Sequence, residues 1–427
     1  MMLNKKTLIA LCGAILIEIN VMGQDSLLRL SVKDAENYAL EHNRLMKTAS
    51  LDIKKAEATK WYAISTMLPQ VTTALDYTDY LGYEVMLGAA GFKMNPTTNF
   101  TAQAAIAVSG QQIVSATLGK IAIDMAKTNY EKTERNIKSQ LRTIYFSILA
   151  MENTVDLLDR NMDNMLKLEA FAQQSATVGV SEQTDADQIS VQVSSMRNTI
   201  NSTKRSLEML YNSMRLMLGT KVDMKIVLTE DIGKVFDTET IEKLLDQGFS
   251  PANNLDYQLT EKNVELAKKQ VRINEWAYGP SLRLYYQYTG KIKKSDFDMN
   301  PPQVIGLNLS IPIFSSGNKL AKVNEAKCDY KSAMYNLETI EDQLKIQDRQ
   351  LRYNLRTNLE NYETQRKNID VSQRVFTNIS NKYEHGYASS IDLTNASTNL
   401  IAAQSNYIQA MLELLNAQIE LETLLNK

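Results

Sequence analysis

Side chains able to carry out chemistry are few and widely separated in this sequence. It holds two histidines, His42 and His385, and two cysteines, Cys12 and Cys328. This spacing provides neither a disulfide framework nor a thiolate zinc site. The sequence also lacks a glycine-rich phosphate loop, a nucleophile elbow and a paired-histidine metalloprotease motif. It therefore predicts no enzyme, no cofactor and no metal site.

Two aspartates are better placed to act on ions. Asp185 and Asp392 each follow a glycine, Gly179 or Gly386, by six residues, at the start of a long amphipathic segment. The helix dipole favours acidic residues in a first turn, and Ser389 with Asp392 has the spacing of a capping box. Carboxylates that converge on a symmetry axis would instead form a negative ring that attracts cations. Both interpretations stay open here.

Composition limits the possible functions and suggests the architecture. The chain has 427 residues, a formal net charge of −2 and seven prolines. A near-neutral chain lacks the basic excess that nucleic-acid binding requires, so we expect no nucleic-acid partner. Because proline interrupts helices, so few prolines indicate long, unbroken helices.

The N-terminus has the features of an export signal. Two lysines precede a short apolar run over 8–17, and the small residue Gly23 precedes a plausible cleavage site. We expect a signal peptide over 1–24, with an uncleaved anchor or a buried helix as the alternatives. Cys12 lacks the small preceding residue of a lipidation site, so lipidation there is not expected. Cys328 falls in an amphipathic helix, where we expect a small core residue.

The chain contains an internal duplication. After the second glycine, apolar residues recur at alternating spacings of three and four: Leu393, Ala396, Leu400, Ala403, Tyr407, Ala410, Leu414, Ala417, Leu421 and Leu424. Subtracting 207 from each position gives a second series in the same phase, in which only Thr203 is polar. This spacing is typical of a coiled-coil seam. Gly179 and Gly386 are expected to be the tips of two helix-turn-helix units.

The duplication divides the mature chain into two repeats of the same element order. We expect a first repeat over 25–218, a linker subdomain over 219–254 and a second repeat over 255–427. The first repeat is expected to contain a helix, strands over 70–80 and 99–109, a long helix over 114–175 and a helix over 183–218. The second is expected to contain a helix, strands over 281–290 and 303–313, a long helix over 315–384 and a helix over 389–425. The linker is expected to hold a short strand over 221–228 and a short helix over 238–248.

Polar and apolar residues alternate along all four long strands. Each strand has about ten residues, the length of a tilted transmembrane strand. A half-buried soluble sheet would show the same alternation. Four strands cannot close a membrane barrel, since small barrels need about eight, so insertion would require several chains.

The two long helices cannot be buried within one compact domain. At about 1.5 Å per residue they would span on the order of 90–105 Å. Apolar residues follow heptad-like spacing through the second one, with Asp348 at the one seam position that is not apolar. This pattern indicates an elongated bundle assembled from several chains.

The mature chain, over 30–427, resembles the TolC-like outer membrane efflux family. The resemblance rests on the duplicated order of elements and on three motifs: Met67-Leu68-Pro69 before the first strand, Leu309-Ser310-Ile311-Pro312-Ile313-Phe314-Ser315-Ser316-Gly317, and Tyr383-x-x-Gly386 followed by Asp392-Leu393. It implies an α+β membrane protein that forms a homotrimer. Four strands per chain would make a twelve-stranded barrel, joined to a helical coiled-coil tunnel across the periplasm.

The resemblance also suggests roles for particular residues. The helix-turn tips form the periplasmic gate in this family, and Asp185 and Asp392 match its acidic gate positions. Tyr383 matches a tyrosine that bonds to the neighbouring tip, although ordinary packing would also explain it. Asn395 occupies a position that is often acidic in relatives. Ala388 stands where the family has an arginine, which argues against a salt-bridged latch.

The function implied is that of a passive conduit. As an outer membrane channel, the protein would be the exit duct of a tripartite efflux pump or a type I secretion system. Its partners would be a periplasmic membrane fusion adaptor, an inner-membrane transporter and outer membrane lipid, in a Gram-negative bacterium. The alternative is a periplasmic coiled-coil adaptor or scaffold that never inserts. The four alternating strands favour the channel, because an adaptor hairpin does not need them.

Overall fold

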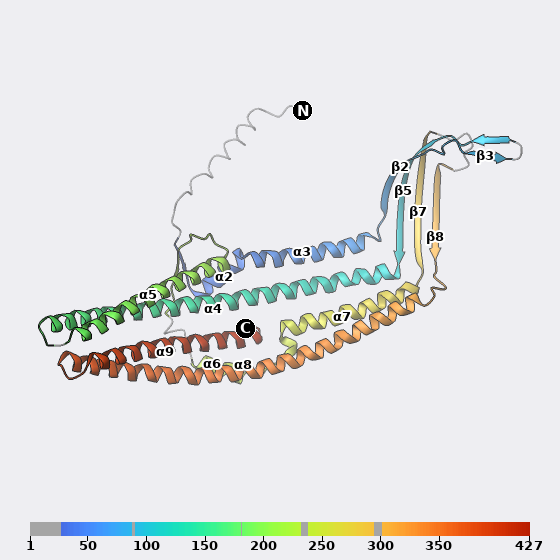
Figure 1. Ribbon diagram of the computed structural model, residues 1–427. Helices are drawn as coiled ribbons and strands as arrows, with labels where there is room; N and C mark the ends of the chain where they lie inside the picture. Colours follow the sequence, from blue (N-terminus) through green and yellow to red (C-terminus); the bar gives the residue numbers. More distant parts are fainter. Residues whose placement is uncertain (1–26, 88–89, 181, 232–237, 294–300) are drawn as a thin grey trace, which may run out of the picture.

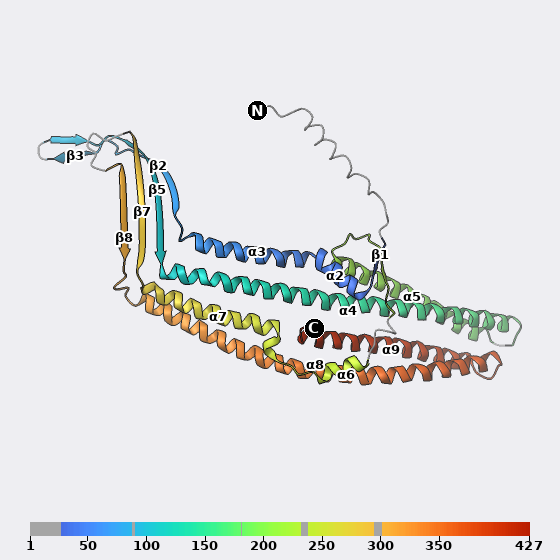
Figure 2. The same ribbon diagram turned by 180° about the vertical axis from the view of Figure 1, so that it is seen from behind.

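The protein is an elongated pair of helical layers with a sheet at one end (Figure 1). The structure, a computed structural model, describes residues 27–87, 90–180, 182–231, 238–293 and 301–427. The signal peptide expected over 1–24 and Cys12 lie outside these residues. Viewed from the front or from behind, α3, α4 and α5 lie along one layer and α7, α8 and α9 along the other (Figure 2).

The two repeats contain matching elements in the same order. The first comprises β1 (Leu28–Leu30), α2 (Val32–His42), α3 (Arg44–Ser65), β2 (Gln70–Thr78), β3 (Glu84–Leu87), β4 (Ala90–Lys93), β5 (Thr97–Ser109), α4 (Gly110–Thr177) and α5 (Gln183–Leu218). The linker contains β6 (Ile226–Leu228) and α6 (Thr238–Asp246). The second repeat follows with η2 (Pro251–Asn253), α7 (Leu255–Glu275), η3 (Trp276–Tyr278), β7 (Ser281–Lys293), β8 (Gln303–Ser310), α8 (Asn318–Glu384) and α9 (Ser390–Leu424).

Local chemistry accounts for the boundaries that differ from those expected. β8 ends at Ser310 rather than at 313, since Pro312 has no N–H to donate to a ladder. α8 begins at Asn318 rather than at 315, because Ser316 and Gly317 take positive φ values of 48° and 79° in a turn. α4 begins earlier than expected, at Gly110, where the Ser109 hydroxyl caps it by accepting from the Gln112 N–H.

The segment between β2 and β5 contains two strands that the sequence analysis did not predict. The sequence predicts no further element between the strands expected over 70–80 and 99–109. The structure instead places the antiparallel pair β3 and β4 there, with Glu84 opposite Lys93. Sequence patterning misses this pair because its strands are only four residues long and β4 begins with Ala90 and Gly91.

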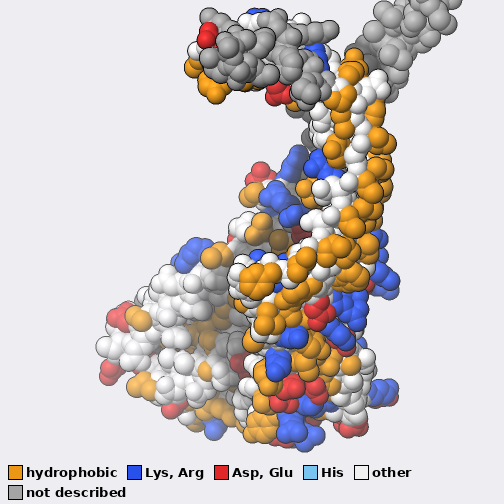
Figure 3. All heavy atoms as spheres, turned by 90° about the vertical axis from the view of Figure 1, so that its right-hand side faces the viewer, with side chains coloured by type: hydrophobic (Ala, Val, Ile, Leu, Met, Phe, Trp, Pro, Cys, Tyr) orange, Lys and Arg blue, Asp and Glu red, His pale blue; other side chains and the backbone are white. Residues whose placement is uncertain are grey.

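The long strands form one antiparallel sheet in the order β2-β5-β7-β8. Its register places Val71, Ala104, Tyr286 and Ile305 in one row across all four strands. Val71 is 72% exposed and Ile305 76% exposed, so the described residues leave this apolar face largely uncovered. Figure 3 shows apolar side chains following the strands over much of their length. The opposite face is polar, and a hydrogen bond there joins Gln103 to Gln287.

The helices pack through three clusters of buried apolar residues. The first surrounds Tyr145, where α2, α4, α5 and α9 meet, and the second joins both helical hairpins near their tips. The third packs α6 against α8 and α9 around Leu355 and Leu421. Within the part of the chain that the structure describes, no helix has the combined length and apolarity needed to cross a membrane.

The seam expected along α9 is buried, but two α8 residues differ from a simple core. Leu393, Leu414 and Leu421 have no exposed area. Cys328 is exposed in the single chain, so its assignment as a core residue was wrong. Asp348, the polar seam residue, accepts hydrogen bonds from Arg352 one turn later, and Arg352 in turn donates to the Leu245 carbonyl.

A parallel ladder between β1 and β6 ties the start of the described chain to the linker. The fully buried Tyr145 hydroxyl donates to the Leu30 carbonyl at 2.9 Å, which fixes this ladder to α4. Burial is the main cause that raises the pKa of Tyr145, so the phenol stays a hydrogen-bond donor.

We expect Tyr145→Phe to lower the free energy of unfolding by about 1 kcal/mol, because the Leu30 carbonyl loses one of its donors. Thermal unfolding in detergent should show a lower midpoint. Tyr335→Phe removes a hydroxyl from a side chain that is 66% exposed and serves as the matched control. Equal midpoints for the two variants would contradict a structural role for the Tyr145 hydroxyl.

Candidate functional site at the helix tips

The turns between α4 and α5 and between α8 and α9 lie at the same end of the molecule (Figure 1). Gly179 and Gly386 take positive φ values of 75° and 76°, which L-residues with a side chain rarely adopt. At each tip the residue after the glycine donates its N–H back across the turn: Val180 to Ser175 and Tyr387 to Lys382. These are Schellman closures, which satisfy the last helical carbonyls.

Asp392 caps its own helix. The Ser389 hydroxyl accepts from the Asp392 N–H at 3.1 Å, and Asp392 accepts from the Ser389 N–H and hydroxyl. The hydroxyl contact, followed by the backbone contact, lowers the pKa of Asp392, so its carboxylate stays ionised. The side chain is exposed. Capping and a negative charge at the tip therefore coexist in one residue.

Asp185 has a different role, although it is the counterpart of Asp392 in the duplication. Its Oδ1 accepts from the hydroxyl of the buried Ser390 at 2.6 Å. The N-cap of its own helix, Glu182, forms no side-chain capping bond. Asp185 therefore connects the tip of the first repeat to the tip of the second.

Tyr383 lies in the same cluster. Its ring packs edge-to-face on Phe171, with the ring centroids 6.0 Å apart. Burial, and then the nearby charge of Asp185, raise the pKa of Tyr383. Asn395 is exposed one turn beyond Asp392 on α9 and lies apart from this cluster.

The sequence identified Asp185 and Tyr383 but missed their partners Ser390 and Phe171. Ser390 follows the capping serine directly, and no sequence spacing reveals that its hydroxyl reaches across to the other repeat. Phe171 lies in the charged and polar last turns of α4. Only the packing of the two hairpins against each other brings these four residues together.

A groove of about 580 Å³ runs beside the tips between α4 and α8. Phe171 and Phe376 provide its apolar surface, and Lys167 and Glu384 place opposite charges on its walls. Phe171 is 41% exposed. The groove therefore combines aromatic surface with charges of both signs next to the tips.

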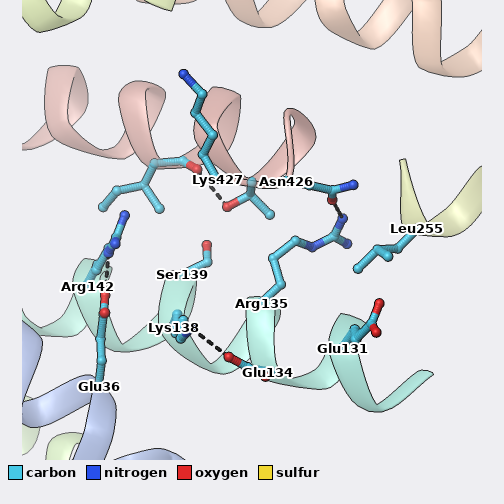
Figure 4. Close-up of a pocket in the computed structure, with 12 residues that line it drawn as sticks. Glu36, Glu131, Glu134, Arg135, Lys138, Ser139, Arg142, Leu255, Asn426 and Lys427 are labelled. Atoms are coloured by element: carbon cyan, nitrogen blue, oxygen red, sulfur yellow. Dashed lines mark hydrogen bonds and ion pairs between the residues drawn. The ribbon is translucent and has the colours of Figure 1, made fainter. Parts of the chain in front are cut away.

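A second polar cavity, of about 350 Å³, lies halfway along the molecule, where α2, α4 and α9 meet (Figure 4). Arg142 bridges Glu36 of α2 and Glu422 of α9, at 2.5 Å and 2.9 Å. Arg135 donates to the Asn426 side chain at 2.7 Å. These contacts join the end of one repeat to the start of the other. Among the described residues, no cluster of three or more acidic, histidine or cysteine side chains is arranged to hold a metal.

Comparison with known proteins identifies the family. Residues 37–220 and 250–427 match the family of outer membrane efflux proteins. This chain belongs to that family. It is 20% identical over 377 residues to the outer membrane protein TolC of Escherichia coli, covering 85% of this chain and 75% of TolC. It is 21% identical to TolC of Salmonella enteritidis over 370 residues, covering 84% of this chain and 74% of that protein.

Solved structures show the same fold. The CmeC outer membrane channel of Campylobacter jejuni superposes with a TM-score of 0.77 at 16% identity, covering 92% of this chain and 85% of CmeC. VceC of Vibrio cholerae gives a TM-score of 0.74 at 14% identity, covering 92% and 95% of the two chains.

Family membership confirms the expected class of the protein. It is a TolC-like outer membrane efflux channel of a Gram-negative bacterium, with a helical tunnel that extends into the periplasm and a barrel that forms on oligomerisation. The alternative of a soluble periplasmic adaptor is not favoured. Members of the family are channels rather than enzymes.

We expect Ser390→Ala to loosen both tips, because it removes the hydrogen bond that Asp185 accepts. Amide exchange in the first turns of α5 and α9 should rise by at least about tenfold, as expected for the loss of a hydrogen bond to a charged group. Thr184→Ala is the control, since Thr184 is exposed and its hydroxyl donates to Glu182, two residues earlier on the same tip. Faster exchange in α9 alone would show that the two tips are not coupled.

Proposed function

We propose that three copies of this chain form the exit duct of a tripartite efflux pump or a type I secretion system. The observation that carries this proposal is the four-stranded sheet with one uncovered apolar face. In the described residues its outer strands, β2 and β8, each have a partner on one side only. Lipid requires every backbone polar group to be paired, so both edges must pair with other chains. Three copies would supply twelve strands.

The oligomer and its location can be tested together. Native mass measurement of the detergent-extracted protein should give three chains, and fractionation should recover it in the outer membrane. A different copy number would contradict the trimer. Recovery in the soluble periplasm without detergent would overturn the channel itself.

The partners we propose are a periplasmic adaptor and an inner-membrane transporter. The groove between α4 and α8 supports the first, because its aromatic residues and its opposite charges suit a helical hairpin of an adaptor. Selection of substrates for export would then begin at the transporter.

At the tips we propose a gate formed by the exposed polar side of α9 and the tip cluster. Asp392 and Asn395 would face the tunnel axis, and Asp185 with Tyr383 would hold the two hairpins together behind them. The ionised state of Asp392 supports this arrangement, since three such carboxylates would make a negative ring. Gly179 and Gly386 would shape the turns that bring this ring into place.

The gate predicts that Asp185→Ala combined with Asp392→Ala weakens block by divalent cations in planar bilayers and lowers cation selectivity, because the ring loses its charge. Asp187→Ala removes an exposed carboxylate two residues away and is the matched control. Unchanged selectivity in the double variant would leave Asp392 with its capping role and Asp185 with its bond to Ser390.

A further inference from the structure

A cavity of about 630 Å³ lies where the sheet meets the helices, far from the tips. Its walls come from the end of α3, the start of α4, α7 and the helix-proximal ends of β5, β7 and β8. The polar residues around it include Thr66, Ser109, Gln112, Ser281 and Asn308. Of the described residues that line it, Arg283 is the only one with a charged side chain. A single positive charge therefore sets the electrostatic character of this cavity.

Register places Arg283 on the polar face of the sheet. Arg283 pairs with Ala107 of β5 and with Asn308 of β8, and the apolar residues Leu282 and Leu284 on either side of it point to the other face. If the apolar face contacts lipid, Arg283 lies on the lumen side. It then occupies the end of the barrel that is nearest the tunnel.

The guanidinium of Arg283 has spare binding capacity. Its Nη2 donates to the Gln103 side chain at 3.3 Å, and its Cζ lies 5.9 Å from the centre of the Tyr285 ring. No carboxylate among the described residues forms an ion pair with it. Both contacts orient the guanidinium without neutralising it, and most of its five N–H donors remain available.

The described residues that line the cavity add polar groups and no carboxylate. Gln112, Ser281 and Asn308 provide neutral polar groups on the cavity wall. α4 begins at Gly110 and α3 ends at Ser65 beside the cavity, so the positive end of one helix dipole and the negative end of the other oppose each other, and Arg283 remains the full charge at the site. A planar guanidinium with neighbouring amide and hydroxyl donors matches a carboxylate or sulfonate.

We propose that this cavity binds the oxyanion group of anionic molecules that pass through the channel, and that Arg283 determines this specificity. The inference rests on the proposed function, because three copies would place three such cavities around one lumen. It adds an anion-selective ring at the base of the barrel, opposite in sign to the carboxylates at the tips.

The experiment uses the full-length oligomer in planar bilayers, with benzenesulfonate as the anionic probe and benzyltrimethylammonium as a cation of similar size. Benzenesulfonate should block the wild-type current from the barrel side more strongly than the cation does. Arg283→Gln should weaken that block about tenfold, the loss expected for a charge-assisted hydrogen bond. Arg283→Lys keeps the charge and should retain most of the block.

Lys291→Gln is the matched control, because Lys291 pairs with Asn99 at the far end of the same strand. It removes an equal charge and should leave the block unchanged. If Lys291→Gln and Arg283→Gln weakened the block by benzenesulfonate equally, the block would depend on the total charge of the lumen. That result would overturn the inference of a local site at Arg283. A conducting wild-type channel that benzenesulfonate does not block would overturn the inference while leaving the channel function intact. A protein that forms no conducting pore would overturn the proposed function.

Discussion

The structure depends on one constraint, which is that backbone hydrogen-bonding groups cannot remain unpaired in hydrocarbon. Each chain makes a sheet of four strands whose apolar residues, such as Val71 and Ile305, are left largely uncovered by the described part of the chain. The sheet is too narrow to close on itself, so its edges are satisfied only when copies associate. Oligomerisation is thus a condition for inserting this sheet, and the other elements must fit the symmetry that it imposes.

The helices must pack closely to fit this symmetry, and they do so through a seam of small and medium apolar residues. Along α9 the buried positions alternate between residues such as Ala396 and larger ones such as Leu400, which allows close approach to α8 and to the first hairpin. Polar contacts such as the bond from Asn161 to Gln404 then fix the relative position of the hairpins. Packing along the seam supplies stability, while these specific bonds set the alignment on which the tips depend.

Much of this architecture could be predicted from sequence because it is periodic. The offset of 207 between the seams revealed the two hairpins, and alternation revealed the four long strands. Short elements escaped, since β3 and β4 have too few residues for a period to show. Cys328 was misplaced because an amphipathic pattern alone does not show which of its small residues the fold buries. Ser390 escaped for a different reason: its partner, Asp185, is 205 positions away and only the packing of the repeats brings them together.

The two tip aspartates show how duplicated positions can take separate roles. Asp392 keeps the capping box of its helix, whereas the N-cap of α5 is Glu182, which forms no side-chain capping bond. Freed from capping, the Asp185 carboxylate accepts instead from Ser390, a residue on the other repeat. Because no side-chain capping bond forms at the start of α5, the Asp185 carboxylate can accept the long-range bond from Ser390. That bond joins the two tips into a single unit. Such a unit can move as one body, because a shift of either hairpin must break the contact between Asp185 and Ser390 or carry the other hairpin with it.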